Sequence, residues 1–239
     1  MEIRWLGHSA FEIISDENVK ILIDPFISNN PSCSTPVEEL NPDIILVTHG
    51  HSDHFGDALE IANTTNVPIA GIHELSVFLS KQGINNISLN IGGSFVFRGI
   101  KFTMLEAQHS AAIDFIEDTV PGGHPASFLI TLEDGTKVFH AGDTGLFGDM
   151  KTIIGDIYKP DILMVPIGDK FTMGPFEAAL ATRWIDPKVA IPMHYNTFPP
   201  IEQDPAIYAN FVSQLIPNID VVILNPGEYF EYNPEQYQD

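Results

Sequence analysis

The chain of 239 residues has a single cysteine, Cys33, so no disulfide can form within it. A lone thiol is typical of proteins in a reducing compartment, and the sequence therefore favours a cytoplasmic location. Basic residues are also few, with 11 Lys and Arg against 32 Asp and Glu and a net charge of −21. Because Lys and Arg supply most of the affinity for phosphates, this balance counts against nucleic acid as a partner.

Long apolar runs are missing as well. No stretch approaches the roughly 20 apolar residues that a helix needs to span a membrane. The N-terminus opens into a strand pattern at residues 2–6 rather than into a basic segment followed by an apolar one. No linker and no low-complexity stretch interrupts the chain. We therefore expect no membrane partner and one domain over residues 1–239.

The most informative segment that is present covers residues 48–54, Thr-His-Gly-His-Ser-Asp-His, directly after an apolar run. Side chains two residues apart on a strand share a face, so His49 and His51 point to the same side. If a helix then begins, Asp53 and His54 face back over the end of the strand. Imidazoles and a carboxylate, with no thiolate, suit a divalent ion with open coordination positions better than a closed structural site.

Other apolar runs also end in potential ligands. The polar residues that follow them are Glu106 and His109, His140 and Asp143, Asp169, and His194. When strands of like direction are each followed by a polar residue, those residues lie along one edge of the sheet. A centre of two ions needs roughly three ligands for each ion and one that bridges them. The sequence holds enough residues for such a centre.

The pattern of apolar residues and turn signals predicts both strands and helices. Strands are expected at 2–6, 10–14, 19–24, 43–48, 95–98, 100–106, 126–132, 137–140, 161–166, 188–193 and 220–224, and helices at 54–64, 73–82, 175–185 and 204–216. Two mixed sheets packed face to face, with helices outside, would bury both faces of each sheet. The least structured segment, 111–124, follows His109, and a loop of that length beside a ligand is often functional.

The series His49-x-His51-x-Asp53-His54, then His109, Asp143 and His194, resembles the metallo-β-lactamase superfamily. Within it, the chain is similar to the metal-dependent hydrolases related to ascorbate-6-phosphate lactonase and to N-acylethanolamine phospholipase D-like enzymes. Further segments of this type are Leu6-Gly7-His8-Ser9, Ile23-Asp24-Pro25-Phe26, His140-Ala-Gly-Asp143-Thr144, Pro166-Ile-Gly-Asp169, Thr172-Met-Gly-Pro175 and Pro192-Met-His-Tyr195. The resemblance implies an α/β fold, the four-layer αββα sandwich of two mixed sheets.

The resemblance also implies a set of ligands for two divalent ions. One ion would be held by His49, His51 and His109, and the other by Asp53, His54 and His194, with Asp143 as the bridge. Di-iron oxygen reductases of this fold use a Glu where this chain has His51. The imidazole favours a hydrolytic zinc centre over a redox iron centre, although nitrogen and oxygen ligands leave manganese and iron open.

The expected chemistry is hydrolysis by a hydroxide that two ions share. Asp53 would orient this hydroxide and take its proton. Tyr195 is a candidate donor to the developing oxyanion, or else an aromatic that packs beside His194. Asp24 is expected to hydrogen-bond a ligand imidazole or to close the 25–36 loop, and Asp169 has the same two interpretations, with direct contact to substrate as a third.

Two histidine assignments are less direct. His124 competes with His109 as the third imidazole, but it starts a strand, at the wrong end for convergence. We therefore favour His109. His8 and His140 are expected to be structural histidines near the site.

The expected substrate is a small molecule, either a lactone or ester, including phosphorylated sugar lactones, or a phosphodiester. Two other classes stay open, an iron-dependent oxidoreductase of the same fold and a metal-binding module without catalysis. A full set of ligands argues against the module, because a structural role needs only one closed ion. Homo-oligomers are common in this fold, so assembly is an expectation of the resemblance.

Overall fold

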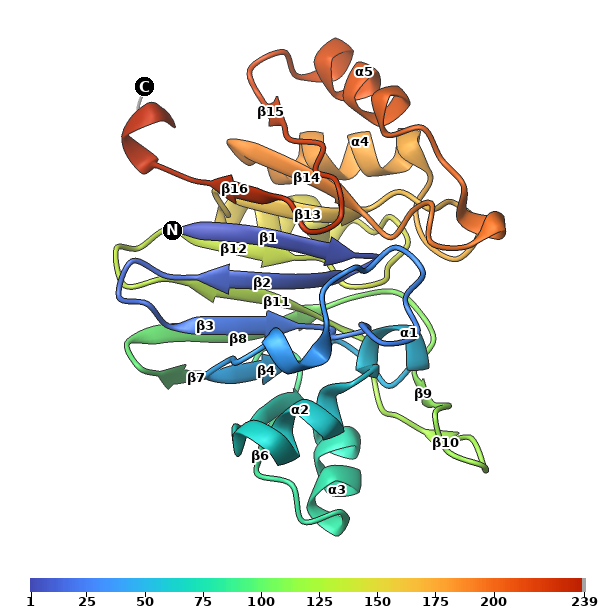
Figure 1. The fold of residues 1–239 in the computed structure, drawn as a ribbon. Helices are drawn as coiled ribbons and strands as arrows, with labels where there is room; N and C mark the ends of the chain where they lie inside the picture. The colour runs from blue at the N-terminus through green and yellow to red at the C-terminus, as the bar shows by residue number, and fades with distance from the viewer. Residues whose placement is uncertain (238–239) are drawn as a thin grey trace.

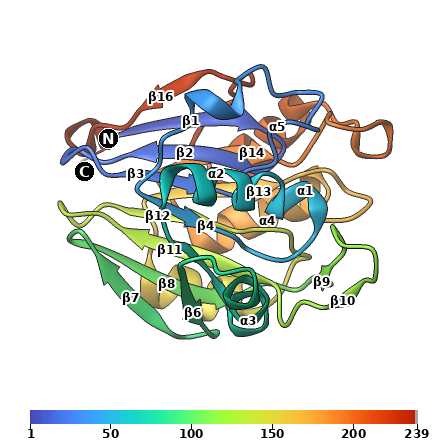
Figure 2. The same ribbon diagram turned by 60° about the horizontal axis from the view of Figure 1, so that its bottom comes forward.

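The structure is a computed structural model that describes residues 1–237, and its centre is a pair of seven-stranded mixed sheets (Figures 1 and 2). The first sheet has the order β16 (Tyr229–Glu231), β1 (Glu2–Gly7), β2 (Ala10–Ile14), β3 (Lys20–Ile23), β4 (Ile44–Leu46), β5 (Ile69–Ile72) and β6 (Asn86–Leu89). The second has the order β15 (Asp220–Val221), β14 (Val189–Met193), β13 (Ile162–Pro166), β12 (Lys137–His140), β11 (Ala126–Thr131), β8 (Ile100–Glu106) and β7 (Ser94–Phe97). A small hairpin, β9 (Ala112–Ile113) and β10 (Val120–Pro121), stands apart.

Each sheet combines an antiparallel and a parallel half. In the first sheet, β1, β2 and β3 are antiparallel, whereas β3 to β6 are parallel. In the second sheet, β7, β8, β11 and β12 are antiparallel, and β12 to β15 are parallel. Two antiparallel steps restore the direction of a strand, so β1 runs with β3 and β8 runs with β12. The carboxyl ends of β1, β3 and β4 therefore share one edge of the first sheet, and those of β8, β12, β13 and β14 share one edge of the second.

The longer helices pack outside the two sheets. The helical segments are α1 (Ser52–Phe55), α2 (Ala58–Thr65), α3 (His73–Lys81), α4 (Pro175–Ile185), α5 (Pro205–Leu215), a π-helical segment η2 (Met150–Tyr158), and the short 3-10 turns η1 (Val37–Glu39), η3 (Pro199–Ile201) and η4 (Pro234–Tyr237). The helix α3 contacts β5 and β6, while α4 contacts β13, α5 and η2. Figure 1 shows α2 and α3 at the bottom and α4 and α5 at the top. This arrangement confirms the predicted αββα sandwich.

The core is continuous and apolar. Large side chains from both sheets are fully buried in it, among them Phe11, Phe102, Phe128 and Phe139. Burial of one such side chain stabilises the fold by about 1.5–3 kcal/mol, which holds the two sheets together. Within residues 1–237, no helix is long and apolar enough to cross a membrane.

The helix starts at Pro175 and Pro205 agree with the sequence prediction, and the Asp204 carboxylate accepts a hydrogen bond from the Ala206 amide. The helix expected at 54–64 was partly wrong. It begins at Ser52, and Gly56, with φ 44°, breaks it into α1 and α2. The strands β5, β6, β9, β10 and β16 and the segment η2 were not predicted, and β9 and β10 form a hairpin within 111–124, which was expected to be the least structured segment.

Candidate metal centre

The predicted ligands come from strand ends that meet at one edge. His49 follows β4, His109 follows β8, Asp143 follows β12, and His194 follows β14. The helix α1 begins directly after His51, so its first turn carries the two remaining ligands, Asp53 and His54. The carboxyl ends of the two sheets thus contribute to one cluster of side chains.

Three imidazoles form the first group. His49, His51 and His109 each present a ring nitrogen within 4.8 Å of those of the other two. The nitrogens His49 Nε2 and His51 Nδ1 are 2.9 Å apart. The structure therefore brings together the three residues expected to hold one ion.

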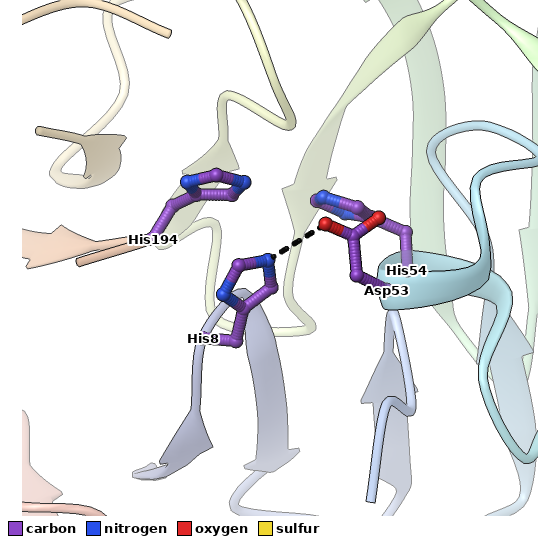
Figure 3. A group of neighbouring side chains, drawn as sticks. All are labelled: His8, Asp53, His54 and His194. Carbon is purple, nitrogen blue, oxygen red and sulfur yellow. Dashed lines mark hydrogen bonds and ion pairs between the residues drawn. The ribbon is translucent and has the colours of Figure 1, made fainter. Parts of the chain in front are cut away.

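A second group lies beside the first. One ligand atom from each of Asp53, His54, His194 and His8 lies within 4.8 Å of the others (Figure 3). Three of these residues were expected to hold the second ion, and His8 joins them.

Asp143 lies between the two groups. Its Oδ1 is 3.2 Å from His54 Nε2, and its Oδ2 is 2.9 Å from His194 Nε2 and 3.6 Å from His109 Nε2. The carboxylate reaches residues of both groups, as a bridging ligand must. Its assignment as the bridge stays a prediction.

Some polar atoms at the centre lie close together without forming hydrogen bonds. Among the described residues, His54 Nε2, Asp143 Oδ1 and His194 Nε2 are buried and make no hydrogen bond, although each nitrogen is close to an oxygen of Asp143, at 3.2 and 2.9 Å. Buried polar atoms in proteins nearly always have partners, so such a cluster of exceptions needs an explanation. Nitrogen and carboxylate donors are the ligands that zinc, manganese and iron accept. The residues present therefore fit a divalent metal.

A buried carboxylate orients two of the imidazoles. Asp24 is fully buried and accepts hydrogen bonds from the Thr48 amide at 2.8 Å, from the Thr48 hydroxyl at 2.7 Å and from His54 Nδ1 at 2.8 Å. Since the Thr48 hydroxyl donates to Asp24, its oxygen is free to accept from His49 Nδ1, 3.0 Å away. These bonds leave the Nε2 atoms of His49 and His54 facing the centre. Orienting an imidazole in this way is the usual role of a carboxylate behind a metal ligand.

The charges at the centre are strongly coupled. Burial alone would lower the pKa of His54, but the carboxylates of Asp143 and Asp24 outweigh it and raise that pKa well above its usual value. Burial likewise opposes ionisation of Asp143, yet the neighbouring His194 and His54 hold its pKa well below normal. Burial lowers the pKa of both His49 and His109, which favours the neutral imidazole that binds a metal.

The backbone around the centre is strained. His8, Asp24 and His194 each follow a strand and adopt left-handed conformations, with φ of 54°, 45° and 56°. Such conformations cost about 1–3 kcal/mol each and persist where the surrounding structure fixes them. Gly168 allows the close approach of the neighbouring loop, because a Cβ there would collide with the carbonyl oxygen of His194. Three of the strained positions of the chain thus lie where the side chains converge, while others, such as Asn66 and Lys159, lie at helix ends away from the site.

His8 has a larger role in the site than the sequence suggested. Its Nε2 lies 3.3 Å from Asp53 Oδ2, and its Nδ1 lies 2.9 Å from the Thr197 hydroxyl. Its backbone oxygen accepts from the His194 amide. Burial and the nearby His194 lower the pKa of His8 to about 4. No sequence signal pairs His8 with Asp53 or Thr197, because they are 45 and 189 residues away along the chain.

The other predicted residues lie outside the cluster. Tyr195 is buried and stacks on Trp5, with ring centroids 5.4 Å apart, and burial raises its pKa to about 12. His124 has a half-exposed side chain, with its Nε2 3.5 Å from Glu106 Oε1. Asp169 is exposed, and its amide donates to a backbone carbonyl in the same loop. Tyr195 thus packs against another aromatic ring, in line with the structural alternative given for it above, and its role as a hydrogen-bond donor stays a prediction.

A cavity of about 650 Å³ opens over the centre. It is lined by Phe26, Asn29, His51, Ser52, Asp53, His109, Ser110, Asp114, Asp143, Phe171, His194 and Phe198. Its size is that of a typical pocket for a small molecule. Four predicted ligands and the proposed bridge, Asp143, are therefore accessible to a substrate from one side.

Known proteins are similar to this chain in sequence and in fold. A sequence profile described as the β-lactamase superfamily domain matches residues 2–194. The chain belongs to the metallo-β-lactamase superfamily. A UPF0173 metal-dependent hydrolase of Methanobrevibacter smithii is 81% identical over 239 residues, which is 100% of both chains. A second such hydrolase, from Methanopyrus kandleri, is 49% identical over 97% of this chain and 100% of its own.

Among solved structures, the metallo hydrolase Igni18 of Ignicoccus hospitalis matches with a TM-score of 0.87. It is 38% identical, over 97% of this chain and 99% of its own. These relatives confirm the predicted superfamily and identify the chain as a metal-dependent hydrolase. The relation to ascorbate-6-phosphate lactonase and N-acylethanolamine phospholipase D-like enzymes stays a prediction.

Proposed function

We propose that the protein is a hydrolase of lactones or esters that works with two divalent ions, and that the preferred metal is zinc. The position of Asp143 carries the proposal, because its carboxylate reaches both groups of candidate ligands while buried atoms around it have no partner. A single structural ion would need only four closed ligands, whereas the two groups and the bridge offer seven predicted ligands and His8.

The two groups would divide the ions as the resemblance implies. One ion would bind His49, His51 and His109, the other Asp53, His54 and His194, and Asp143 would bridge. Bound ions of this kind supply a nucleophilic water at neutral pH and polarise the carbonyl oxygen of a substrate.

The protein's own residues orient the ligand imidazoles and place the Asp53 carboxylate at the cavity. The Asp24–Thr48 network fixes the rings of His49 and His54, so that little reorganisation is needed during the reaction. The Asp53 side chain faces the cavity, and His8 steadies its Oδ2. Although burial opposes its ionisation, the hydrogen bond from His8 and the charge of His54 lower the pKa of Asp53, so that its carboxylate is stabilised in the ionised form. An ionised carboxylate can bind an ion and orient the attacking water, whereas its lowered pKa makes Asp53 a weak general base.

The test is hydrolysis of two probes, a simple lactone and a chromogenic phosphodiester, by protein loaded with zinc or with manganese. Asp143→Ala is the inactive reference, and Asp149→Ala, an exposed carboxylate six residues away, is the matched control. We expect opening of the lactone that depends on Asp143 and not on Asp149. Cleavage of the phosphodiester alone would contradict the carbonyl assignment, and activity that survives Asp143→Ala would contradict the centre.

A further inference from the structure

One wall of the cavity is aromatic. Phe26 follows β3, Phe171 follows β13 and Phe198 follows β14, and all three line the cavity. The rings of Phe26 and Phe198 are 6.2 Å apart between centroids, and the His8 ring contacts both edgewise, at 5.7 and 5.8 Å. These distances are typical of aromatic side chains that pack against each other. The wall next to the centre is therefore apolar and held in place from behind.

Phe171 also lines the cavity, and its side chain is 55% exposed, so its ring is accessible to a ligand from solvent. The Nζ of Lys170 lies over the Phe171 ring, 5.4 Å from its centroid, and Lys170 does not line the cavity.

The rest of the lining carries no positive charge from Lys or Arg. Apart from the phenylalanines and the proposed metal ligands, it consists of Asn29, Ser52, Ser110 and Asp114, and no Lys or Arg is among the described residues that line the cavity. Asp114 accepts a hydrogen bond from the Ser52 amide at 2.6 Å, which fixes a carboxylate in this lining. An anionic group on the substrate, away from the reacting carbonyl, would meet this carboxylate and the net charge of −21, and no Lys or Arg of the lining would pair with it.

We propose that the preferred substrate is an uncharged lactone or ester bearing an apolar group of about the size of a phenyl ring, which packs against Phe26, Phe171 and Phe198. This inference rests on the proposed hydrolysis and deepens it, because it excludes phosphorylated sugar lactones from the lactones considered above. Water adds across the acyl C–O bond, the ring opens to a hydroxy acid, and the acid releases one proton, which a pH indicator detects.

Three lactones with the same ring test the proposal on the zinc-loaded protein. They are γ-butyrolactone, its γ-phenyl derivative and its γ-carboxylate derivative. We expect kcat/KM for the phenyl lactone to exceed that for the parent by about tenfold or more, the usual size of an apolar specificity effect. The carboxylate lactone should be the poorest of the three.

Variants test whether Phe171 causes this preference. Phe171→Ala should reduce the ratio of kcat/KM for the phenyl lactone to kcat/KM for the parent lactone. Phe171→Arg should raise kcat/KM for the carboxylate lactone. The matched control is Phe176→Ala on α4, which removes another exposed phenylalanine, 46% exposed and outside the cavity. Its three values should equal those of the wild type.

Binding separates this proposal from the proposed reaction. The affinities of the phenyl and carboxylate lactones for the Asp143→Ala variant can be compared by saturation-transfer NMR, where no turnover interferes. If the phenyl lactone binds preferentially but the wild type does not hydrolyse it, the result would support the aromatic binding surface and refute lactone hydrolysis. Turnover of the carboxylate lactone equal to or faster than that of the phenyl lactone, or equal binding of both, would overturn the proposed substrate class.

Discussion

Replacement of Asp24 by Asn should weaken metal binding although Asp24 touches no ion in our assignment. The carboxylate accepts three hydrogen bonds, two from Thr48 and one from His54, and it is fully buried. An amide keeps one accepting oxygen and adds two donors, so at least one buried donor loses its partner. An unpaired buried donor costs about 1–3 kcal/mol, and we expect the free energy of unfolding of the metal-free protein to fall by about that amount or slightly more.

The effect on metal follows from the loss of orientation. Removing a carboxylate behind a metal ligand typically lowers affinity 10–100-fold, about 1.4–2.7 kcal/mol. Competition with a chromophoric chelator measures the zinc affinity, and urea unfolding of the metal-free protein measures stability. A variant that keeps wild-type zinc affinity would refute the proposed role of Asp24.

A matched control is available in the second sheet, at the end away from the centre. Asp134 accepts hydrogen bonds from the amide and the hydroxyl of Thr136, both at 2.8 Å, just as Asp24 accepts from Thr48. Asp134 is exposed and lies in the turn between β11 and β12. Asp134→Asn should leave zinc affinity unchanged, so that a loss seen only in Asp24→Asn reports on the centre.

Three further predictions concern histidines. His109→Ala should weaken zinc binding by more than tenfold, while His124→Ala should leave it unchanged; zinc titration decides, and the opposite order would exchange their roles. His8→Gln should retain the metal but lower turnover by about tenfold if His8 positions Asp53, whereas loss of an ion would make His8 a ligand. Because its neighbouring carboxylates raise the pKa of His54, the metal-free protein holds a proton there more tightly than a free imidazole does, and zinc must displace that proton; calorimetry in buffers of different ionisation enthalpy should detect its release, and the affinity should rise with pH.

The raised pKa of His54 also affects the fold. A group with a raised folded pKa contributes stability at pH values below its unfolded pKa and loses it as the pH rises through the folded value. The metal-free protein should therefore lose this contribution on the alkaline side, and the zinc-loaded protein should not. Urea unfolding of both forms at pH 6 and pH 9 compares them, and an equal change in both would contradict the assignment.

The convergence of the predicted ligands could be expected from the sequence because most of them follow strands. Polar residues after β4, β8, β12 and β14 converge for a geometric reason, since strands of like direction end at one edge. Pro175 and Pro205 mark helix starts for an equally local reason, because proline fits the first helical position.

What the sequence did not predict depends on contacts far apart along the chain. The strand β5 is four residues long and contains Gly71, and β6 mixes polar and apolar residues, so only pairing within the sheet defines them. The contact of His8 with Asp53 joins β1 to α1 and has no local signature. The break at Gly56 was missed because the helical pattern of apolar residues continues through it.

The most direct test of the account is the number of ions bound by the wild type and by Asp143→Ala, measured by elemental analysis after zinc loading and gel filtration. The account predicts two zinc ions for each wild-type chain and fewer in the variant, since the bridging carboxylate is lost. Full retention of two ions by a folded Asp143→Ala protein, or a single ion in the wild type, would contradict the centre of two ions with Asp143 as its bridge.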